Sequence, residues 1–287
     1  MTSTTATTAA ADGTPILVRH WAPAVEPWAY AVLVHGIAEH SGRYEHVGDW
    51  LAEAGLDVVG YDLRGFGGSG GPRAWVDRWS RHHDDLEERV VSARAAAIGR
   101  PVVVYGHSLG GLIALGYALS DAPRLQPDAL ILSAPALDST VPGWKRILAR
   151  GIAAVRPRLE MANDFDGGLL SRDRTVGERY LVDPLNHHRT TVGFAVRAFD
   201  EQTRVRSALR RLTIPTLVFH GEADELVPAE VSAPLAELPS VTRRTYPRLR
   251  HETHNEPEGA EVVADAVAWL GSTVGSSGAP VVDSADN

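Results

Sequence analysis

Two serines of this chain lie in a G-x-S-x-G pentapeptide, the pattern in which many hydrolases carry a nucleophilic serine. Ser108 lies in GHSLG and Ser69 lies in GGSGG. Such a nucleophile directly follows a strand, occupies a tight turn and precedes a helix, which leaves its hydroxyl exposed at the sheet edge. The apolar run VVVYG leads into Ser108 and LIALGYALS follows it. Ser108 is therefore the candidate nucleophile.

The loop around Ser69 has a different context. It ends at Pro72, after which RAWVDRW shows no helical pattern. The loop also contains G-x-G-x-x-G at Gly65, Gly67 and Gly70, but this fingerprint binds a dinucleotide only where its last glycine opens a helix. We therefore expect a flexible glycine loop and no dinucleotide cofactor.

A nucleophilic serine needs a general base, and the base needs an acid that orients it. In folds that use this serine turn, the acid follows the serine along the chain and the histidine follows the acid. Asp224 comes just after the apolar run IPTLVFHG, and its HG-x-x-D spacing favours it over its neighbours Glu222 and Glu225. His251 follows the next predicted strand, and His254 is its nearby competitor.

Taken singly, each of these residues has an ordinary structural explanation as a helix cap, a turn residue or a solvated side chain. Their order, and their places at the C-terminal ends of separate strands where open parallel sheets bind ligands, favour a catalytic set. The tetrahedral intermediate at such a site also needs two amide donors. We expect these at Leu109, directly after the candidate nucleophile, and at Ile37 in the loop HGIAEHSGRY.

Short apolar runs alternate with helical patterns along the chain, which predicts an α/β fold with a mostly parallel sheet flanked by helices. Several runs, such as YAVLVHG, are apolar throughout, as expected of strands that are buried on both faces. The predicted strands cover residues 14–21, 30–36, 56–62, 101–107, 128–135, 214–221 and 241–247. The predicted helices cover residues 44–55, 79–99, 108–120, 228–237 and 258–271.

Residues 137–207 interrupt this alternation and predict a helical cap inserted between strands of the sheet. A predicted helix at 144–155 carries apolar residues at helical spacing, namely Trp144, Ile147, Leu148, Ile152 and Val155. The core then consists of residues 12–136 and 208–273, and we expect disordered tails at 1–11 and 274–287.

The composition is that of a soluble globular protein, with 44% hydrophobic and 22% charged residues among 287. A formal net charge of −8 argues against a nucleic-acid partner, because such binding needs a clustered cationic face. The one arginine-rich segment, residues 204–211, resembles an exposed helix face instead. No apolar run is long enough to cross a bilayer, and MTSTTATTAA lacks the features of a secretory signal. The absence of cysteine excludes disulfides and thiol catalysis and is compatible with the cytoplasm.

Twelve histidines raise the question of a metal site. HETH at 251–254 is one residue shorter than the zinc motif H-E-x-x-H, and its proline-rich flank does not favour a helix. His82 and His83 are adjacent, as are His187 and His188, and neighbours on a helix point in different directions. We therefore predict no metal.

Six segments occur in an order that resembles the monoacylglycerol lipase group of α/β hydrolases, especially its bacterial members: HGIAEHSGRYEHV, YDLRGFGGSGG, GHSLGG, LLSRD, HGEADELVP and HETHNEPE. The resemblance extends from about residue 14 to 270 and includes the insertion, which makes it more specific than the pentapeptide alone. It implies an α/β-hydrolase fold and a serine esterase without a cofactor that cleaves monoacylglycerols. By position it also implies the triad and the oxyanion amides, Ser108, Asp224, His251, Ile37 and Leu109.

The resemblance also implies where the substrate lies. Matching family positions place its glycerol end at Glu39, Arg43 and His254, although a Glu39–Arg43 salt bridge is a structural alternative. The cap of the family borders an acyl tunnel and can make transient contact with a membrane or lipid-droplet surface. If the helix at 144–155 forms a lid, we expect Trp144, Ile147 and Leu148 to face the pocket or the membrane. The alternative is that these residues cover the core.

Two departures from the family pattern leave the substrate class open. Phe66 stands where the family often has histidine, and Ile37 is larger than the usual residue. The same fold and triad also serve general carboxylesterases, lysophospholipases and C–C hydrolases. An alternative of another class is a catalytically silent scaffold that binds a small ligand. The sequence does not indicate an oligomeric state.

Overall fold

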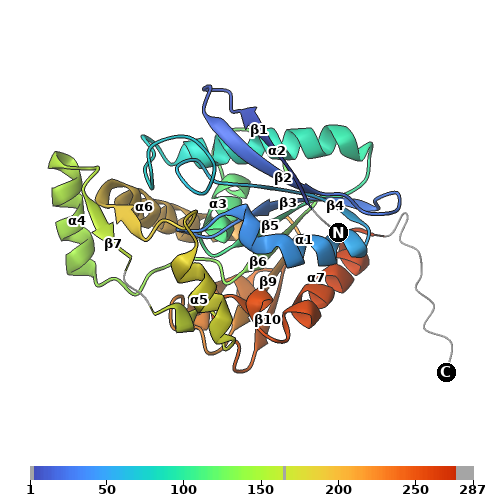
Figure 1. Ribbon diagram of the computed structural model, residues 1–287. Helices are drawn as coiled ribbons and strands as arrows, with labels where there is room; N and C mark the ends of the chain where they lie inside the picture. Colours follow the sequence, from blue (N-terminus) through green and yellow to red (C-terminus); the bar gives the residue numbers. More distant parts are fainter. Residues whose placement is uncertain (1–2, 164–165, 276–287) are drawn as a thin grey trace.

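The computed structural model describes residues 3–163 and 166–275 (Figure 1). Its centre is an eight-stranded sheet with the strand order β1-β2-β4-β3-β5-β6-β9-β10. Neighbouring strands from β4 to β10 run parallel, whereas β2 is antiparallel to both β1 and β4. The predicted α/β class with a mostly parallel sheet is confirmed. The strands are β1 Thr4–Ala9, β2 Pro15–Trp21, β3 Ala29–Val34, β4 Leu56–Tyr61, β5 Val102–His107, β6 Ala129–Ser133, β9 Thr216–Gly221 and β10 Val241–Tyr246.

Helices cover both faces of the sheet and bury alternate side chains of its strands. In β3, Val32 and Val34 pack on one face while Ala31 and Leu33 pack on the other, which is why this strand is apolar throughout. The first face is covered by α2, α3 and α6, and the second by α1 and α7. These helices are α1 Glu45–Glu53, α2 Ser80–Ala97, α3 Leu109–Ala118, α6 Val192–Ala208 and α7 Gly259–Val274.

The N-terminal segment expected to be disordered instead contains the edge strand β1, which pairs antiparallel with β2. All six of its residues are exposed, so it lacks the alternation of buried and polar residues from which strands are predicted. Threonine has a high strand propensity, and pairing with β2 satisfies one side of the backbone. At the other end of the chain α7 continues to Val274, and residues 276–287 of the expected tail lie outside the described part.

The helix predicted at residues 228–237 is a 3₁₀ helix, Ala229–Glu237, rather than an α-helix. It contains Pro234, whose ring nitrogen has no hydrogen to donate to an α-helical acceptor. The sequence pattern therefore predicted a helix at the right place but not its 3₁₀ type.

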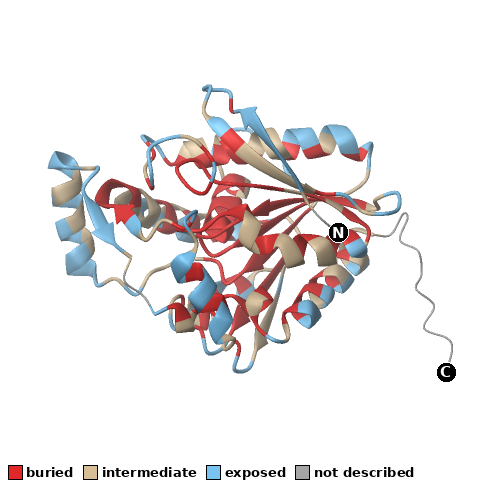
Figure 2. Ribbon diagram, viewed as in Figure 1, coloured by how far each residue is buried: buried red, intermediate tan, exposed pale blue. Residues whose placement is uncertain are grey.

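The segment predicted as the cap contains α4, β7, α5, β8 and nearly all of α6. The two strands pair with each other as a separate antiparallel ribbon. α4 and β7 lie at the left of Figure 1, away from the main sheet, and no residue of α4 is buried (Figure 2). α6 packs on α4 and also on α3, so it connects this segment to the core. The remaining bounds are α4 Gly143–Val155, β7 Glu160–Ala162, α5 Arg174–Val182 and β8 Arg189–Thr191.

The turn between β5 and α3 holds Ser108 at a positive φ of 51°. This conformation is costly for a residue with a side chain and persists only where the surrounding packing maintains it. A Cβ on Gly110 would lie 2.1 Å from the carbonyl oxygen of Val34, and a Cβ on Gly106 would lie 2.5 Å from that of Gly110. The start of α3 therefore approaches β3 more closely than any larger residue permits.

We expect Gly110→Ala to lower the free energy of unfolding by about 1–3 kcal/mol, the usual cost of forcing an additional methyl group into a packed region. Gly271→Ala is the matched control, because a Cβ there meets no atom within 4 Å. This helix substitution should raise the free energy of unfolding by about 0.5–1 kcal/mol. Urea unfolding measures both, and equal stabilities would contradict the close contact at Gly110.

Candidate active site

Three residues predicted from the sequence lie at the C-terminal edge of the sheet. Ser108 follows β5, Asp224 follows β9 and His251 follows β10. The Nδ1 of His251 donates to Oδ2 of Asp224 at 2.7 Å, and Ser108 and His251 line the same cavity. Because Nδ1 carries the hydrogen, the neutral ring has its lone pair at Nε2, as a general base for a serine hydroxyl requires.

The Asp224 carboxylate is fixed by donors around its own turn. The backbone amides of Leu226 and Val227 both donate to Oδ1 at 2.9 Å. Nε2 of His220 lies 3.1 Å from Oδ2, and Nδ1 of the same ring lies 2.9 Å from Oγ of Ser232. Oδ2 thus lies between two histidine rings, and only that of His251 lines the cavity.

The residues that the sequence offered as alternatives for the acid and the nucleophile lie in other environments. Glu222 and Glu225, the neighbours of Asp224, are exposed. Ser69 is buried, and its Oγ accepts from the amide of Leu17 at 2.9 Å and donates to the carbonyl oxygen of Asp62 at 2.6 Å. Ser69 therefore ties the glycine loop to β2 and the end of β4, which is a structural role.

Burial and neighbouring charges shift the pKa values of His251 and Asp224 in opposite directions. Burial lowers the pKa of His251, but the adjacent Asp224 carboxylate outweighs it and leaves that pKa above its ordinary value of 6.5. Burial raises the pKa of Asp224, but the His251 ring and the hydrogen bonds that the carboxylate accepts hold that pKa well below its ordinary value. The carboxylate thus stays ionised and stabilises a protonated His251.

We expect kcat/KM for an ester to fall with decreasing pH, with the midpoint of this acid limb above pH 6.5. His251 can act as a base only when neutral, and a raised pKa keeps the ring protonated up to a higher pH. A pH–rate profile with a soluble ester measures the midpoint. A midpoint below 6.5, or a rate independent of pH in this range, would contradict the expectation.

The two residues expected to donate oxyanion amides also line the cavity. Leu109 is the first residue of α3, and the first amides of a helix have no acceptor within it. Ile37 lies in the turn after β3, and its amide has no acceptor among the described residues. Its side chain is 38% exposed, so the bulk of this residue is compatible with the turn. The following Ala38 has a positive φ of 62°.

A buried ion cluster forms part of the cavity wall beside these loops. Arg43 pairs with Glu39 and donates to both oxygens of Glu252, at 2.7 Å each. Glu39 also accepts from the hydroxyl of Tyr44 at 2.7 Å. The Arg43 guanidinium lies over the ring of Tyr180, 4.9 Å from its centroid. The salt bridge considered from the sequence is therefore present, and it includes a second carboxylate.

His254, the third residue expected at the glycerol end, does not line this cavity. It is 1% exposed and stacks on Tyr44 with a centroid distance of 4.9 Å. It borders a separate polar cavity on the far side of Arg43. Burial holds the pKa of His254 well below its ordinary value, so the ring is neutral. The structure thus brings Glu39 and Arg43 to the cavity and places His254 behind them.

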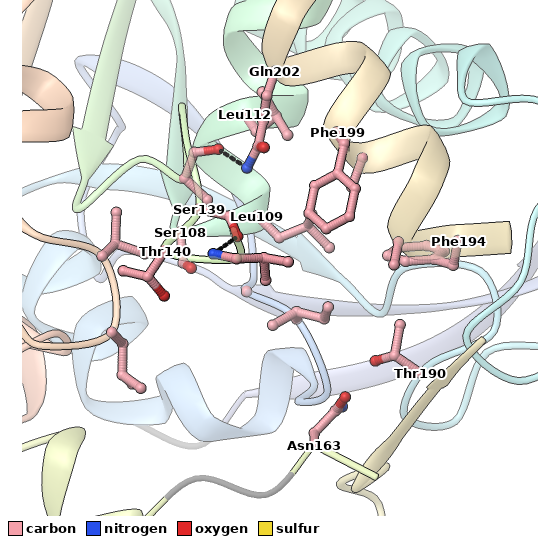
Figure 3. A pocket seen from close by; sticks show the side chains of 18 of the residues that line it. Ser108, Leu109, Leu112, Ser139, Thr140, Asn163, Thr190, Phe194, Phe199 and Gln202 are labelled. Atoms are coloured by element: carbon pink, nitrogen blue, oxygen red, sulfur yellow. Dashed lines mark hydrogen bonds between the residues drawn. The ribbon is translucent and has the colours of Figure 1, made fainter. Parts of the chain in front are cut away.

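The cavity has a volume of about 590 Å³ and extends from Ser108 under the cap. Its cap side is mostly apolar, with Trp144, Leu148 and Ile152 from α4 and Phe194 and Phe199 from α6. Figure 3 shows the side chains of α6 facing the region of the candidate nucleophile. Trp144 and Leu148 line the cavity and are also 64% and 56% exposed, so they lie at its mouth.

Several residues of the site were not predicted from the sequence. Glu252 adjoins the candidate base, and a search for charged neighbours of His251 would have found it. Tyr180, Asn163 and Thr190 line the cavity from the cap, and their positions depend on folding contacts that leave no local signal. Phe66, the departure from the family pattern, is fully buried and is part of the core.

Within the part of the chain that the structure describes, no group of three or more histidine and acidic side chains is arranged to hold a metal ion. His82 and His83 are buried in α2, whereas His187 and His188 precede β8 in a loop rather than a helix. In the same part of the chain, no helix has the length and apolar character needed to cross a bilayer.

Comparison with known proteins identifies the family. Residues 25–258 match the family described as serine aminopeptidase, S33. The chain is 34% identical to the monoacylglycerol lipase of Mycolicibacterium smegmatis, over 91% of this chain and 95% of that protein. The chain belongs to the monoacylglycerol lipase family. The resemblance found in the sequence is confirmed, and with it the prediction of a carboxylic ester hydrolase.

Other members of the monoacylglycerol lipase family agree with this assignment. Human monoglyceride lipase is 31% identical over 93% of this chain and 90% of its own length. The crystal structure of the Paleococcus ferrophilus monoacylglycerol lipase matches with a TM-score of 0.78 at 30% identity, covering 90% of this chain and 99% of that one. The shared α/β-hydrolase fold therefore includes nearly the whole chain.

Proposed function

We propose that the protein hydrolyses monoacylglycerols to glycerol and fatty acid, with Ser108 as nucleophile, His251 as base and Asp224 as the acid that orients the base. The observation that carries this proposal is the cavity, which contains Ser108 and His251 and is lined mostly by apolar side chains of α4 and α6. An apolar cavity next to an activated serine suits an ester with a long acyl chain. The lipase relatives support the same substrate class.

The reaction follows from the roles of these groups. His251 takes the hydroxyl proton as Oγ of Ser108 attacks the ester carbonyl, and the amides of Ile37 and Leu109 stabilise the oxyanion. His251 then protonates the glycerol oxygen, the ester bond breaks and an acyl-enzyme remains. A water molecule then attacks the acyl carbonyl as it loses a proton to His251, the bond to Oγ of Ser108 breaks, and His251 returns the proton to Oγ as the fatty acid leaves. Asp224 stabilises the imidazolium in both halves, and no step needs a cofactor.

The charges beside the nucleophile favour a neutral head group over a phosphate. Glu39 and Glu252 outnumber Arg43 in the buried cluster, so its formal charge is negative. A lysophospholipid would bring its anionic phosphate towards this wall, whereas a glycerol ester brings only hydroxyl groups. The carboxylates of Glu39 and Glu252 are both paired with Arg43. Neither is therefore free to bind the ammonium group of an aminopeptidase substrate. General carboxylesterase activity is the remaining alternative within this chemistry.

A substrate series tests the proposal. We expect kcat/KM to be higher for monoacylglycerols than for a lysophospholipid, a diacylglycerol, a p-nitrophenyl ester or an aminoacyl anilide. Ser108→Ala should lower kcat by about 10⁴-fold or more, because the nucleophile is lost while binding remains. A fluorophosphonate probe should label the native protein and not this variant, and circular dichroism controls for folding.

The outcomes separate the alternatives. Cleavage of the simple ester alone would retain the mechanism and remove the lipase assignment. Failure of the probe to label Ser108, together with an absence of hydrolysis, would favour the catalytically silent scaffold. Hydrolysis that survives Ser108→Ala would contradict the triad.

Transient contact of the cap with a lipid surface is part of the same proposal. Its support is the exposed apolar face of α4, where Ile147 and Val155 are 72% and 81% exposed (Figure 2). Trp144 and Leu148 continue this face into the cavity mouth. Apolar side chains on an amphipathic surface helix insert into the boundary between lipid head groups and acyl chains. An acyl chain could then pass from the lipid into the cavity past α4.

Paired variants distinguish docking from acyl binding. Replacing Ile147 and Val155 by serine should reduce sedimentation with phosphatidylcholine vesicles and the hydrolysis of vesicle-bound substrate, because neither side chain lines the cavity. Hydrolysis of a soluble short-chain ester should stay unchanged. Replacing Trp144 and Leu148 by serine should slow long-chain soluble substrates more than short ones. Equal losses on all substrates for both pairs would refute the assignment of separate roles.

A further inference from the structure

The turn after β3, residues 36–39, packs directly against the candidate nucleophile. A Cβ on Gly36 would lie 3.4 Å from Cβ of Ser108 and 3.3 Å from Cδ2 of His107. Gly36 and Ile37 both line the cavity. An ester bound at Ser108 therefore has its carbonyl close to this turn. The direction of the backbone N–H groups in the turn then decides whether one of them can meet the oxyanion.

His35 fixes the carbonyl of the peptide unit that carries the Ile37 amide. The backbone amide of Leu63 donates to Nε2 of His35 at 2.8 Å, so the hydrogen of the neutral ring is on Nδ1. Burial lowers the pKa of His35, which keeps the ring neutral. Nδ1 therefore donates to the carbonyl oxygen of Gly36 at 2.7 Å.

The direction of the Ile37 N–H follows from this hydrogen bond. The Gly36–Ile37 peptide bond is trans, and the N–H and C=O of a trans peptide unit point in opposite directions. The Gly36 carbonyl points at His35, which is fully buried and does not line the cavity. The Ile37 N–H therefore points away from His35, and it has no acceptor among residues 3–163 and 166–275.

Glu39 fixes the amide of Gly36 from the other end of the turn. Its Oε1 accepts from this amide at 2.5 Å and from the Tyr44 hydroxyl at 2.7 Å. Its Oε2 pairs with Arg43, which binds both oxygens of Glu252. Glu39 is 2% exposed, so these are charge-assisted hydrogen bonds of a desolvated carboxylate. The carboxylate thus closes the turn and anchors it to the buried ion cluster.

The same turn is strained at Ala38. Its positive φ of 62° is costly for a residue with a side chain and persists only where the surroundings maintain it. The carbonyl oxygen of Ala38 accepts from the amide of His187 at 3.2 Å and from the hydroxyl of Tyr180 at 3.3 Å. Gly36 has no side chain to restrict its backbone, so its orientation depends on the hydrogen bonds of its own amide and carbonyl.

We propose that Glu39 is a positioning residue of the reaction, which acts through the Gly36 amide. Together with His35 it holds the Gly36–Ile37 peptide unit so that the Ile37 N–H faces the developing oxyanion. This inference rests on the proposed function, in which that amide stabilises the oxyanion. The role differs from the contact with glycerol that the family resemblance implies for Glu39. An amide aimed at the oxyanion acts in the transition state, so its loss lowers kcat and leaves KM nearly unchanged.

Two substitutions at position 39 test this role. Glu39→Met keeps the length of the side chain and removes the acceptor for the Gly36 amide, whereas Glu39→Gln keeps a carbonyl oxygen for it. Hydrolysis of a 1-monoacylglycerol and of the methyl ester of the same acid should be measured at a temperature where circular dichroism shows the variants to be folded. We expect Glu39→Met to lower kcat about tenfold to a hundredfold on both esters, up to the usual effect of losing one oxyanion donor. KM should change by less than about threefold, and Glu39→Gln should keep most of the native rate.

A transition-state analogue adds a second readout. A trifluoromethyl ketone with the same acyl chain forms a tetrahedral adduct with Ser108, and Glu39→Met should lower its affinity by the same factor as kcat/KM. Glu201→Met is the matched control, because Glu201 is also buried and pairs with Arg204 but does not line the cavity. It should leave both kcat on the two esters and the affinity for the ketone unchanged.

A loss confined to the monoacylglycerol would overturn the proposal, because Glu39 would then bind the glycerol. A rise in KM alone, or equal losses in Glu39→Met and Glu39→Gln, would also overturn it. A native protein that does not prefer the monoacylglycerol over the methyl ester loses the proposed function. The positioning role is shared by both esters and is decided by the two variants in that case as well.

If Glu39→Met does not fold, His35→Asn and His35→Leu give the same comparison from the carbonyl side of Gly36. Both variants lose the acceptor for the Leu63 amide, but only asparagine keeps a donor near the position of Nδ1. We expect kcat to be higher in His35→Asn than in His35→Leu on both esters, with similar KM. Equal values of kcat would overturn the proposal.

Discussion

The geometry of the site depends on the close approach of α3 to β3, which only a glycine at position 110 permits. In the turn directly before this contact, Ser108 has a positive φ. Two backbone hydrogen bonds also hold Ser108. Its amide donates to the carbonyl oxygen of Ser133 at 2.9 Å, and its carbonyl oxygen accepts from the amide of Ala136 at 3.0 Å. The candidate nucleophile is thus fixed by packing and backbone hydrogen bonds of the core, and the cap takes no part in these contacts.

Buried charges then connect the loops that the sheet brings together. Arg43 joins Glu39, which lies in the loop after β3, to Glu252, which adjoins the candidate base. Tyr180 of α5 lies on the same guanidinium and also donates from its hydroxyl to the carbonyl oxygen of Ala38 in the loop after β3. Three segments that are distant in sequence are therefore held in one arrangement. A displacement of any of them disturbs a desolvated ion cluster, which makes independent movement of the loops costly.

The sequence allowed prediction of those features that local pattern encodes. Apolar runs identified the buried strands because both faces of the sheet are covered, and strand ends located Ser108, Asp224 and His251. The exposed strand β1 was missed because it has no buried face. The cap contacts were missed for another reason: Asn163 and Thr190 meet only through the pairing of two short strands. The family resemblance predicted His254 at the glycerol end of the substrate, whereas this ring stacks on Tyr44 outside the cavity.

The two cap helices that line the cavity are attached very differently. α6 approaches α3 at Gly116, where Arg204 donates to the carbonyl oxygens of Gly116 and Leu119 at 2.8 and 2.9 Å and pairs with the buried Glu201. α4 has no buried residue and packs mainly on α6. α4 can therefore shift at small energetic cost while Phe194 and Phe199 stay in place. The apolar wall of the cavity therefore combines a firmly attached helix, α6, with a loosely attached one, α4.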